Sequence, residues 1–205
     1  MTEKEKQTEE IIFEAATEVF EEKGLAGARM QNIADKAGIN KALLHYYYRT
    51  KDHLFEAVFT ALAKKVFSRF TPIFDPGKSI EDKIRFFFNE HIDFLKSNPK
   101  LPGFILNEIN HNPERIKKMI SNIPIKEVWM SVLEMHRNEL DKYNITEETL
   151  PQLLTSIVSL SVFPFAAKGI FEAVMGNMGI SFNEYIEARK EYAAEFVIRS
   201  IRKDS

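Results

Sequence analysis

The sequence contains no cysteine, a single tryptophan and no long uninterrupted apolar run. The absence of cysteine excludes disulfides and thiolate metal sites, and it permits a reducing compartment. Residues 1–6 include no apolar segment, so we expect no signal peptide. The longest uncharged run, residues 149–167, is interrupted by proline, serine and threonine, which argues against a membrane span of about 20 apolar residues. We therefore expect a cytoplasmic protein.

Charge is unevenly distributed, although the formal net charge is only −2. Residues 1–22 carry eight glutamates and two lysines, whereas residues 23–51 carry six basic side chains and one aspartate. A short basic segment in an otherwise acidic chain is typical of a small surface that contacts phosphate. A solvated charged surface would give the same pattern, so this observation alone does not decide between the two.

Apolar residues recur at helical spacing along the whole chain, and no pair of segments is typical of strands. The pattern predicts an all-α protein with about nine helices. Three short helices come first, the second and third over residues 30–36 and 41–47. Gly24 is predicted to end the first helix, Gly38 to form the turn after the second, and Asn40 to cap the third. Short helices joined by a glycine turn are typical of a helix-turn-helix.

The segment 148–175 carries two apolar stripes, one of small residues and one of bulky residues. We expect one helix here, kinked at Pro164. A helix with apolar residues on two sides is buried on two sides. One stripe can therefore form a subunit interface, and the alternative is a central core helix of a monomer.

Residues 32–55, NIADKAGINKALLHYYYRTKDHLF, resemble the N-terminal signature of TetR/AcrR transcriptional regulators. The resemblance extends over about residues 8–60, and the length and helical remainder fit the family less specifically. It implies a helix-turn-helix DNA-binding domain at residues 1–50 and a larger helical domain at 51–205 that binds a ligand and dimerises. The last two helices of this family form a four-helix dimer interface.

The resemblance also implies which residues contact DNA. Base edges would be contacted by the third helix, and the DNA backbone by residues around it. The predicted base contacts are Lys41, Ala42, Leu43 and His45, and the predicted backbone contacts are Arg29, Gln31, Tyr46, Tyr47 and Lys51. His45, Tyr47 and Tyr48 depart from the usual residues of the family, which puts the operator sequence in doubt.

Lys51 is informative without the resemblance. A lysine in the first turn of a helix opposes the helix dipole. Together with the free amides of that turn it would form an anion site that suits a DNA phosphate. The alternative is a solvated lysine.

A ligand cavity is predicted among aromatic residues and histidines of the larger domain. His91 and His136 lie on apolar helix faces, where a hydrogen-bonded core histidine is the alternative to a polar group in a cavity wall. The predicted lining residues are Phe88, His91, Phe104, Trp129, His136 and Phe171. We expect the ligand to be small and largely hydrophobic.

The sequence thus predicts a homodimeric repressor that leaves a palindromic operator when the ligand binds, with no cofactor and no enzymatic activity. One alternative is a regulator of the same fold without a small-molecule inducer. Another is a helical enzyme or metal-binding protein. Glu108 and His111 have the spacing of half a di-iron motif, but no second copy occurs, and the sequence has neither a nucleophile elbow nor a phosphate loop.

Overall fold

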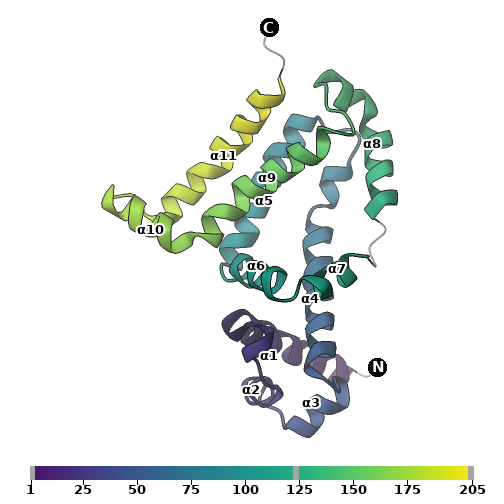
Figure 1. The fold of residues 1–205 in the computed structure, drawn as a ribbon, viewed down its shortest axis with the longest axis vertical. Helices are drawn as coiled ribbons and strands as arrows, with labels where there is room; N and C mark the ends of the chain where they lie inside the picture. Colours follow the sequence, from purple (N-terminus) through teal and green to yellow (C-terminus); the bar gives the residue numbers. More distant parts are fainter. Residues whose placement is uncertain (1–2, 122–124, 203–205) are drawn as a thin grey trace. The chain divides into compact units, whose positions relative to one another are not determined.

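The computed structural model describes residues 3–121 and 125–202. For a few helical residues in these ranges, including Trp129, it describes the backbone and not the side chain. Within these ranges the chain forms eleven α-helices, one short 3-10 helix and no strand (Figure 1). The all-α fold is confirmed, with eleven helices where about nine were expected. The helices are α1 (Glu3–Gly27), α2 (Met30–Lys36), α3 (Lys41–Tyr47), α4 (Lys51–Arg69), η1 (Thr71–Phe74), α5 (Ile80–Ser97), α6 (Leu101–His111), α7 (Pro113–Ser121), α8 (Ile125–Lys142), α9 (Leu150–Ala166), α10 (Lys168–Asn177) and α11 (Phe182–Ile201).

The packing divides the chain into two compact units. The first unit is Met1–Ser68 with Gly103–Ile120, and the second is Arg69–Pro102 with Ser121–Ser205. The helix-turn-helix therefore shares its unit with nearly all of α4 and most of α6. The predicted domain boundary after residue 50 remains a prediction about function, because packing alone groups more of the chain with the first three helices.

The core of the first unit forms on one face of α1, as the helical spacing predicts. Ile12, Ala16 and Phe20 are buried, and the Phe20 ring meets Phe55 of α4 edge to face, with centroids 5.3 Å apart. The helical run breaks at Gly24, whose φ of 62° is a conformation that favours glycine. The predicted stop at this residue is confirmed.

In the second unit, α5 packs against both α9 and α11 (Figure 1). One apolar face of α5 is largely buried, including Ile84, Phe88 and Leu95. Ser79 caps the helix by accepting a hydrogen bond from the Asp82 N–H at 3.1 Å. This central helix therefore provides most of the apolar surface on which the second unit is built.

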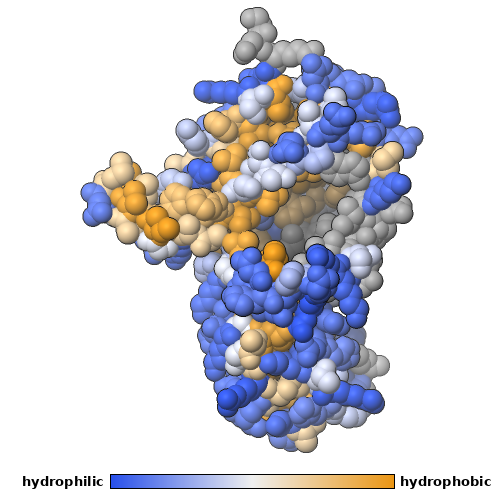
Figure 2. Space-filling view, viewed as in Figure 1, coloured by the Kyte–Doolittle hydropathy of each residue, from blue (hydrophilic) through white to orange (hydrophobic). Residues whose placement is uncertain are grey.

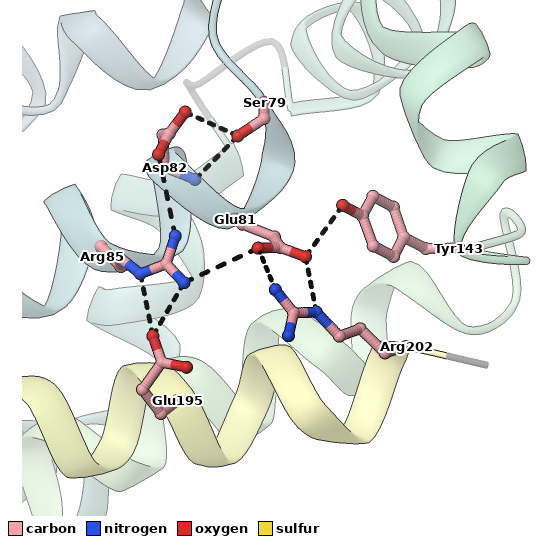
Figure 3. Close-up of polar contacts among 7 residues, drawn as sticks. All are labelled: Ser79, Glu81, Asp82, Arg85, Tyr143, Glu195 and Arg202. Carbon is pink, nitrogen blue, oxygen red and sulfur yellow. Dashed lines mark hydrogen bonds and ion pairs between the residues drawn. The ribbon is translucent and has the colours of Figure 1, made fainter. Parts of the chain in front are cut away.

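A polar network fastens the first turns of α5 to α11 (Figure 3). Glu81 accepts two hydrogen bonds from the Arg202 guanidinium, at 2.8 and 2.6 Å, and one from the Tyr143 hydroxyl at 3.2 Å. Arg85 donates to Glu195 of α11 at 2.8 Å. The hydrogen bonds from Arg202 lower the pKa of the Glu81 carboxyl. The end of α11 is thus held to α5 by charge-assisted hydrogen bonds.

The single helix expected over residues 148–175, kinked at Pro164, is instead two helices, so this prediction is wrong. α9 stops at Ala166 and α10 starts at Lys168, and the two are bent by 74°. Proline has no N–H, so the Leu160 carbonyl four residues earlier loses its helical partner. Arg189 of α11 fills that place, its Nε donating to the Leu160 oxygen at 2.8 Å. A side chain from another helix thus stabilises the broken end.

The hydropathy of the described helices bears on membrane insertion. No single helix among them is both long and apolar enough to cross a membrane. The bent pair α9 and α10 passes that test of length and composition only when the two are taken together.

Candidate nucleic-acid interface and ligand cavity

The third helix is held in place by its inner face. Leu44 is fully buried and Tyr48, just after the helix, is 5% exposed. The Tyr48 hydroxyl donates to Glu9 of α1 at 2.9 Å, and burial raises the pKa of this phenol. Asn40 accepts a hydrogen bond from the Leu43 N–H at 2.7 Å, the predicted N-cap. Leu44 and Tyr48 therefore anchor the inner face of the third helix.

The outer face of α2 and α3 is open to solvent. The turn between them contains Gly38 at φ 67°, with no other atom within 4 Å of where a Cβ would lie. Tyr46 is 76% exposed, and its ring meets that of Tyr47 edge to face at 5.5 Å. Of the residues predicted to contact DNA, Arg29, Gln31, Lys41, Ala42, His45 and Tyr46 are exposed, and Leu43, Tyr47 and Lys51 are half-buried.

Two exposed side chains on this face are already oriented by hydrogen bonds. Gln31 donates to Asp35 at 2.7 Å, one turn later on α2. His45 Nδ1 lies 3.2 Å from the Arg49 carbonyl, which can only accept, so this nitrogen carries a hydrogen. The Nε2 atom of a neutral His45 is then an acceptor, which suits the exposed amino group of cytosine or adenine.

Lys51 has partners that the sequence did not indicate. Its ammonium donates to the Ala28 carbonyl at 2.9 Å and lies 3.4 Å from the Ala26 carbonyl. Both carbonyls lie around the end of α1, where helical partners run out. Lys51 therefore joins the start of α4 to the end of α1, and its contact with DNA phosphate stays a prediction.

The chain is similar to one family model and to two curated regulators. A family model described as bacterial regulatory proteins of the tetR family matches residues 12–58. The chain is a TetR-family transcriptional regulator. It is 22% identical to the HTH-type transcriptional regulator YttP of Bacillus subtilis over 162 residues, 77% of each chain. It is 36% identical to the HTH-type transcriptional repressor SCO4008 of Streptomyces coelicolor over 95 residues, 46% of this chain and 45% of that protein.

The fold of the whole chain also matches the TetR family. The crystal structure of the transcriptional regulator FadR from Bacillus subtilis, in complex with stearoyl-CoA, superposes with a TM-score of 0.64. The identity is 16%, and the match covers 90% of this chain and 96% of that one. The predicted family and its DNA-binding helix-turn-helix are thus confirmed. The roles of individual side chains are not settled by likeness at this level.

Glu108 has a structural role in this TetR-family chain that the sequence did not reveal. Its carboxyl, in a residue only 1% exposed, accepts hydrogen bonds from the Leu25 N–H and from Asn112, each at 3.0 Å. His111 instead bonds to the carbonyl of Asn107 at 2.9 Å. The half di-iron motif therefore serves the packing of α6 on α1. Among the described residues no three acidic or histidine side chains gather as metal ligands.

Four of the six residues predicted to line a ligand cavity have packing partners within the described part of the chain. Phe104 is buried in the first unit, with its ring centroid 5.8 Å from that of Phe55. Phe88 is fully buried in α5, and Phe171 stacks on Tyr185 of α11 at 5.3 Å. These rings stabilise the core by ordinary aromatic packing.

His91 is the fourth of these residues. Its Nδ1 lies 2.8 Å from the hydroxyl of Ser161 on α9, and burial lowers the pKa of its ring to about 4. It is therefore a hydrogen-bonded histidine in this structure, and its place in a ligand cavity stays a prediction. The side chain of Trp129 lies outside the described part of the structure.

The second unit does contain an apolar cavity, of about 150 Å³. Among the described predicted residues only His136 lines it. The walls come from η1, α5, the end of α8 and the start of α9. They are formed by Ile73, Phe74, Ile80, Lys83, Ile84, Phe87, His136, Leu140, Ile145, Leu150, Leu153, Leu154, Ile157 and Val158. Lys83 was not predicted from the sequence as a cavity residue. Its charge on an apolar helix face, between Ile80 and Ile84, could have indicated that role.

Proposed function

We propose that this protein is a homodimeric repressor that binds a palindromic operator and leaves it when a small hydrophobic ligand binds the second unit. The observation that carries the DNA-binding part is the arrangement of α3, whose inner face is anchored by Leu44 and Tyr48 while its outer face is exposed. A short, rigidly held and exposed helix beside a basic segment is what entry into the major groove requires.

The exposed side chains divide into two roles. Lys41, Ala42, Leu43 and His45 face the position of base edges, where Lys41 suits guanine and the two apolar residues suit thymine methyl groups. Residues at the ends of α2 and α3 and at the start of α4 face the position of the backbone, where hydrogen bonds fix the register. They are Arg29, Gln31, Tyr46, Tyr47 and Lys51.

The dimer is supported by apolar side chains that one protomer leaves uncovered. They gather on α10 and the adjoining end of α9, where Figure 2 shows a largely apolar surface. Phe163, Ile170 and Met178 are each more than 60% exposed. On α11, Tyr192 and Phe196 are one turn apart and also exposed. A contiguous exposed apolar patch is typical of a protein interface. Regulators of this family form homodimers, so the partner we propose for this surface is a second copy of the chain.

The ligand is supported by the apolar cavity in the second unit. FadR of Bacillus subtilis, which shares the fold, is described in complex with stearoyl-CoA, a molecule with a long apolar chain. α6 offers a path from ligand to DNA, because its first residues belong to the second unit while Glu108 holds the end of α1 in the first. A shift of α6 would act on the Leu25 N–H and hence on the helices that follow.

Selection of binding sites from random DNA tests this function. We expect a palindromic site that the protein binds with a strong dependence on salt. Lys41→Ala should weaken the binding and change the preferred bases, whereas Lys64→Ala, an exposed lysine of α4, should do neither. Equal losses in both variants, or a pool that yields no preferred site, would contradict the role of α3.

A further inference from the structure

Two polar side chains stand in the otherwise apolar wall of the cavity. Lys83 and His136 are each 7% exposed, and Lys83 Nζ lies 3.1 Å from His136 Nδ1. The other lining residues are aliphatic or phenylalanine. Burying an ammonium costs free energy unless the group is paired and hydrogen-bonded. The partners of Lys83 at the cavity wall therefore need to be identified.

The hydrogen bond between the two residues fixes the form of the histidine. An ammonium has only donors, so His136 Nδ1 accepts and the hydrogen of the neutral ring sits on Nε2. Burial, and then the charge of Lys83, lower the pKa of His136, which favours the neutral ring. The buried His136 Nε2 has no hydrogen-bond partner within the described part of the chain. The pair therefore holds an unused N–H donor in an apolar surrounding, behind a cavity surface that is formed by carbon atoms alone.

The charge of Lys83 is also not matched by a carboxylate in contact. No acidic oxygen of the described residues lies within 4 Å of its Nζ, and its hydrogen-bond partner among them is the neutral histidine. Asp75 and Glu139 attract it from farther away and Lys78 repels it, while burial lowers its pKa. Of these two acids, Glu139 is itself hydrogen-bonded to Lys142. An anion placed beside Lys83 would supply the missing partner.

We propose that the cavity binds a small apolar carboxylic acid in its anionic form. The two side chains turn toward the cavity when the acid binds. One carboxylate oxygen then accepts from the Lys83 ammonium, the other from His136 Nε2–H, and the apolar body lies against the aliphatic wall. The volume sets the size of the body, since an apolar cavity of about 150 Å³ holds one benzene ring. The proposal names the class of ligand for the cavity of the proposed repressor. Only the expectation that this ligand releases the protein from DNA rests on the proposed function.

Calorimetric titration with matched pairs of probes tests the proposal. The pairs are benzoate with benzyl alcohol and hexanoate with 1-hexanol, which share a body and differ in the anion. We expect wild-type protein to bind at least one acid about tenfold or more tightly than its alcohol. Lys83→Met, which keeps the length of the side chain, should lose that preference and still bind the alcohol. Lys126→Met, at an exposed lysine of α8 in the same unit, should behave as wild type.

A second measurement guards against variants that fold poorly. With carboxyl-labelled ¹³C-hexanoate, binding to wild type should lower the pKa of the bound acid, because the cation favours its charged form. His136→Phe should weaken acid binding and leave alcohol binding intact. If wild type prefers neither acid to its alcohol, or if Lys83→Met keeps the preference, the proposal is wrong. These assays contain no DNA, so a failure of operator binding would leave their result standing, and the reverse also holds.

Discussion

At the scale of single residues, Arg29 and Lys51 share a predicted role and have different surroundings. Arg29 is exposed at the start of α2, whereas Lys51 donates to carbonyls at the end of α1. We expect Arg29→Ala to weaken DNA binding about equally across sequences and to lower the slope of log affinity against log salt by about 1. Lys51→Ala should do the same and also lower the free energy of unfolding by about 1 kcal/mol, since it removes a charged hydrogen bond.

Equilibrium denaturation and salt titration of DNA binding separate the two effects. Lys64→Ala serves as the control for the loss of one exposed positive charge from the same unit. If both variants keep the DNA affinity and the salt slope of wild type, neither Arg29 nor Lys51 contacts a DNA phosphate. Unchanged stability in Lys51→Ala would show that the two carbonyl bonds contribute nothing measurable.

His91 should make stability depend on pH. Burial lowers the pKa of its ring to about 4, against 6.5 in the unfolded chain. Because the unfolded state binds the proton more readily, the stabilisation is fully present above pH 6.5. It is lost as pH falls towards 4 and changes little below that. A shift of this size corresponds to about 3 kcal/mol at most.

The measurement is the free energy of unfolding at pH 7 and pH 4.5 for wild type and His91→Gln. The glutamine can still bond to Ser161 but does not titrate, so we expect a smaller loss of stability at pH 4.5 in the variant, by about 2 kcal/mol. Some dependence will remain from His136, whose pKa is also lowered. Parallel pH profiles for the two proteins would contradict the assignment.

The residue scale shows what helical spacing reveals and what it leaves hidden. The period of 3.6 predicts Leu44 and Ile33 as buried, because burial follows the face of a helix. It gives no indication of the partners of Lys51, because these are backbone carbonyls more than twenty positions away. Every residue has a carbonyl, so the sequence carries no pattern that marks the ones used.

At the scale of elements, the break at Pro164 gives a test of how α11 supports α9. Arg189→Met removes the donor to the partly buried Leu160 carbonyl and should lower the free energy of unfolding by about 1 kcal/mol, the contribution of one hydrogen bond. Pro164→Ala restores an N–H that can bond to the same carbonyl. In that background Arg189→Met should cost less.

A double-mutant cycle on the two positions, measured by denaturation, gives the coupling directly. Arg199→Met, an exposed arginine of the same helix, is the control. If the arginine substitution costs the same with and without the proline, Arg189 acts through packing or through Tyr185 and not through the freed carbonyl.

The helices themselves were largely predictable, because their caps and stops are local. α2 and α3 begin and end where Asn40, Gly38 and the apolar spacing place them. Pro164 was expected to kink one helix, and instead it separates two. The difference lies in Ala167, whose φ and ψ of −106° and 27° are not helical. That choice depends on what α11 offers the freed end, which no local pattern contains.

The cavity belongs to the scale of the whole molecule, and the sequence placed only His136 in it. A cavity forms where side chains from several elements fail to fill the space between them, and this one is lined from η1, α5, α8 and α9. Aromatic content indicated a large apolar interior, but it could not separate rings that pack solidly, such as Phe88, from walls that leave a gap.

The dimer also belongs to this scale. Gly169 on α10 is exposed, and a Cβ there would meet no atom within 4 Å. We expect Gly169→Arg to leave the protomer folded and to shift the dimer towards monomer, because a large charged side chain would enter the uncovered apolar surface. Sedimentation measures the shift. Gly103→Arg, also without neighbours within 4 Å, is the control. A dimer of wild-type affinity in Gly169→Arg would place the interface elsewhere.

The geometry of the operator follows from twofold symmetry. A dimer presents two copies of α3, so the DNA it selects should be a pseudo-palindrome. If both copies enter successive major grooves on one face, their centres lie about 34–36 Å apart. Since the chain has no cysteine, Lys36→Cys offers one spin-label site per protomer on exposed α2. Pulsed electron resonance then reports the separation, and we expect DNA to narrow its distribution and the ligand to shift it.

The shift should appear in affinity as well. A ligand that changes the spacing acts on both half-sites at once, and a coupling of about 1–3 kcal/mol would weaken operator binding by roughly 5- to 150-fold. By reciprocity the operator should weaken ligand binding by the same factor, which a titration of the protein–DNA complex measures. A selected site without twofold symmetry would contradict the paired arrangement of α3. A ligand that binds the cavity and leaves both the label distance and the DNA affinity unchanged would contradict release by spacing.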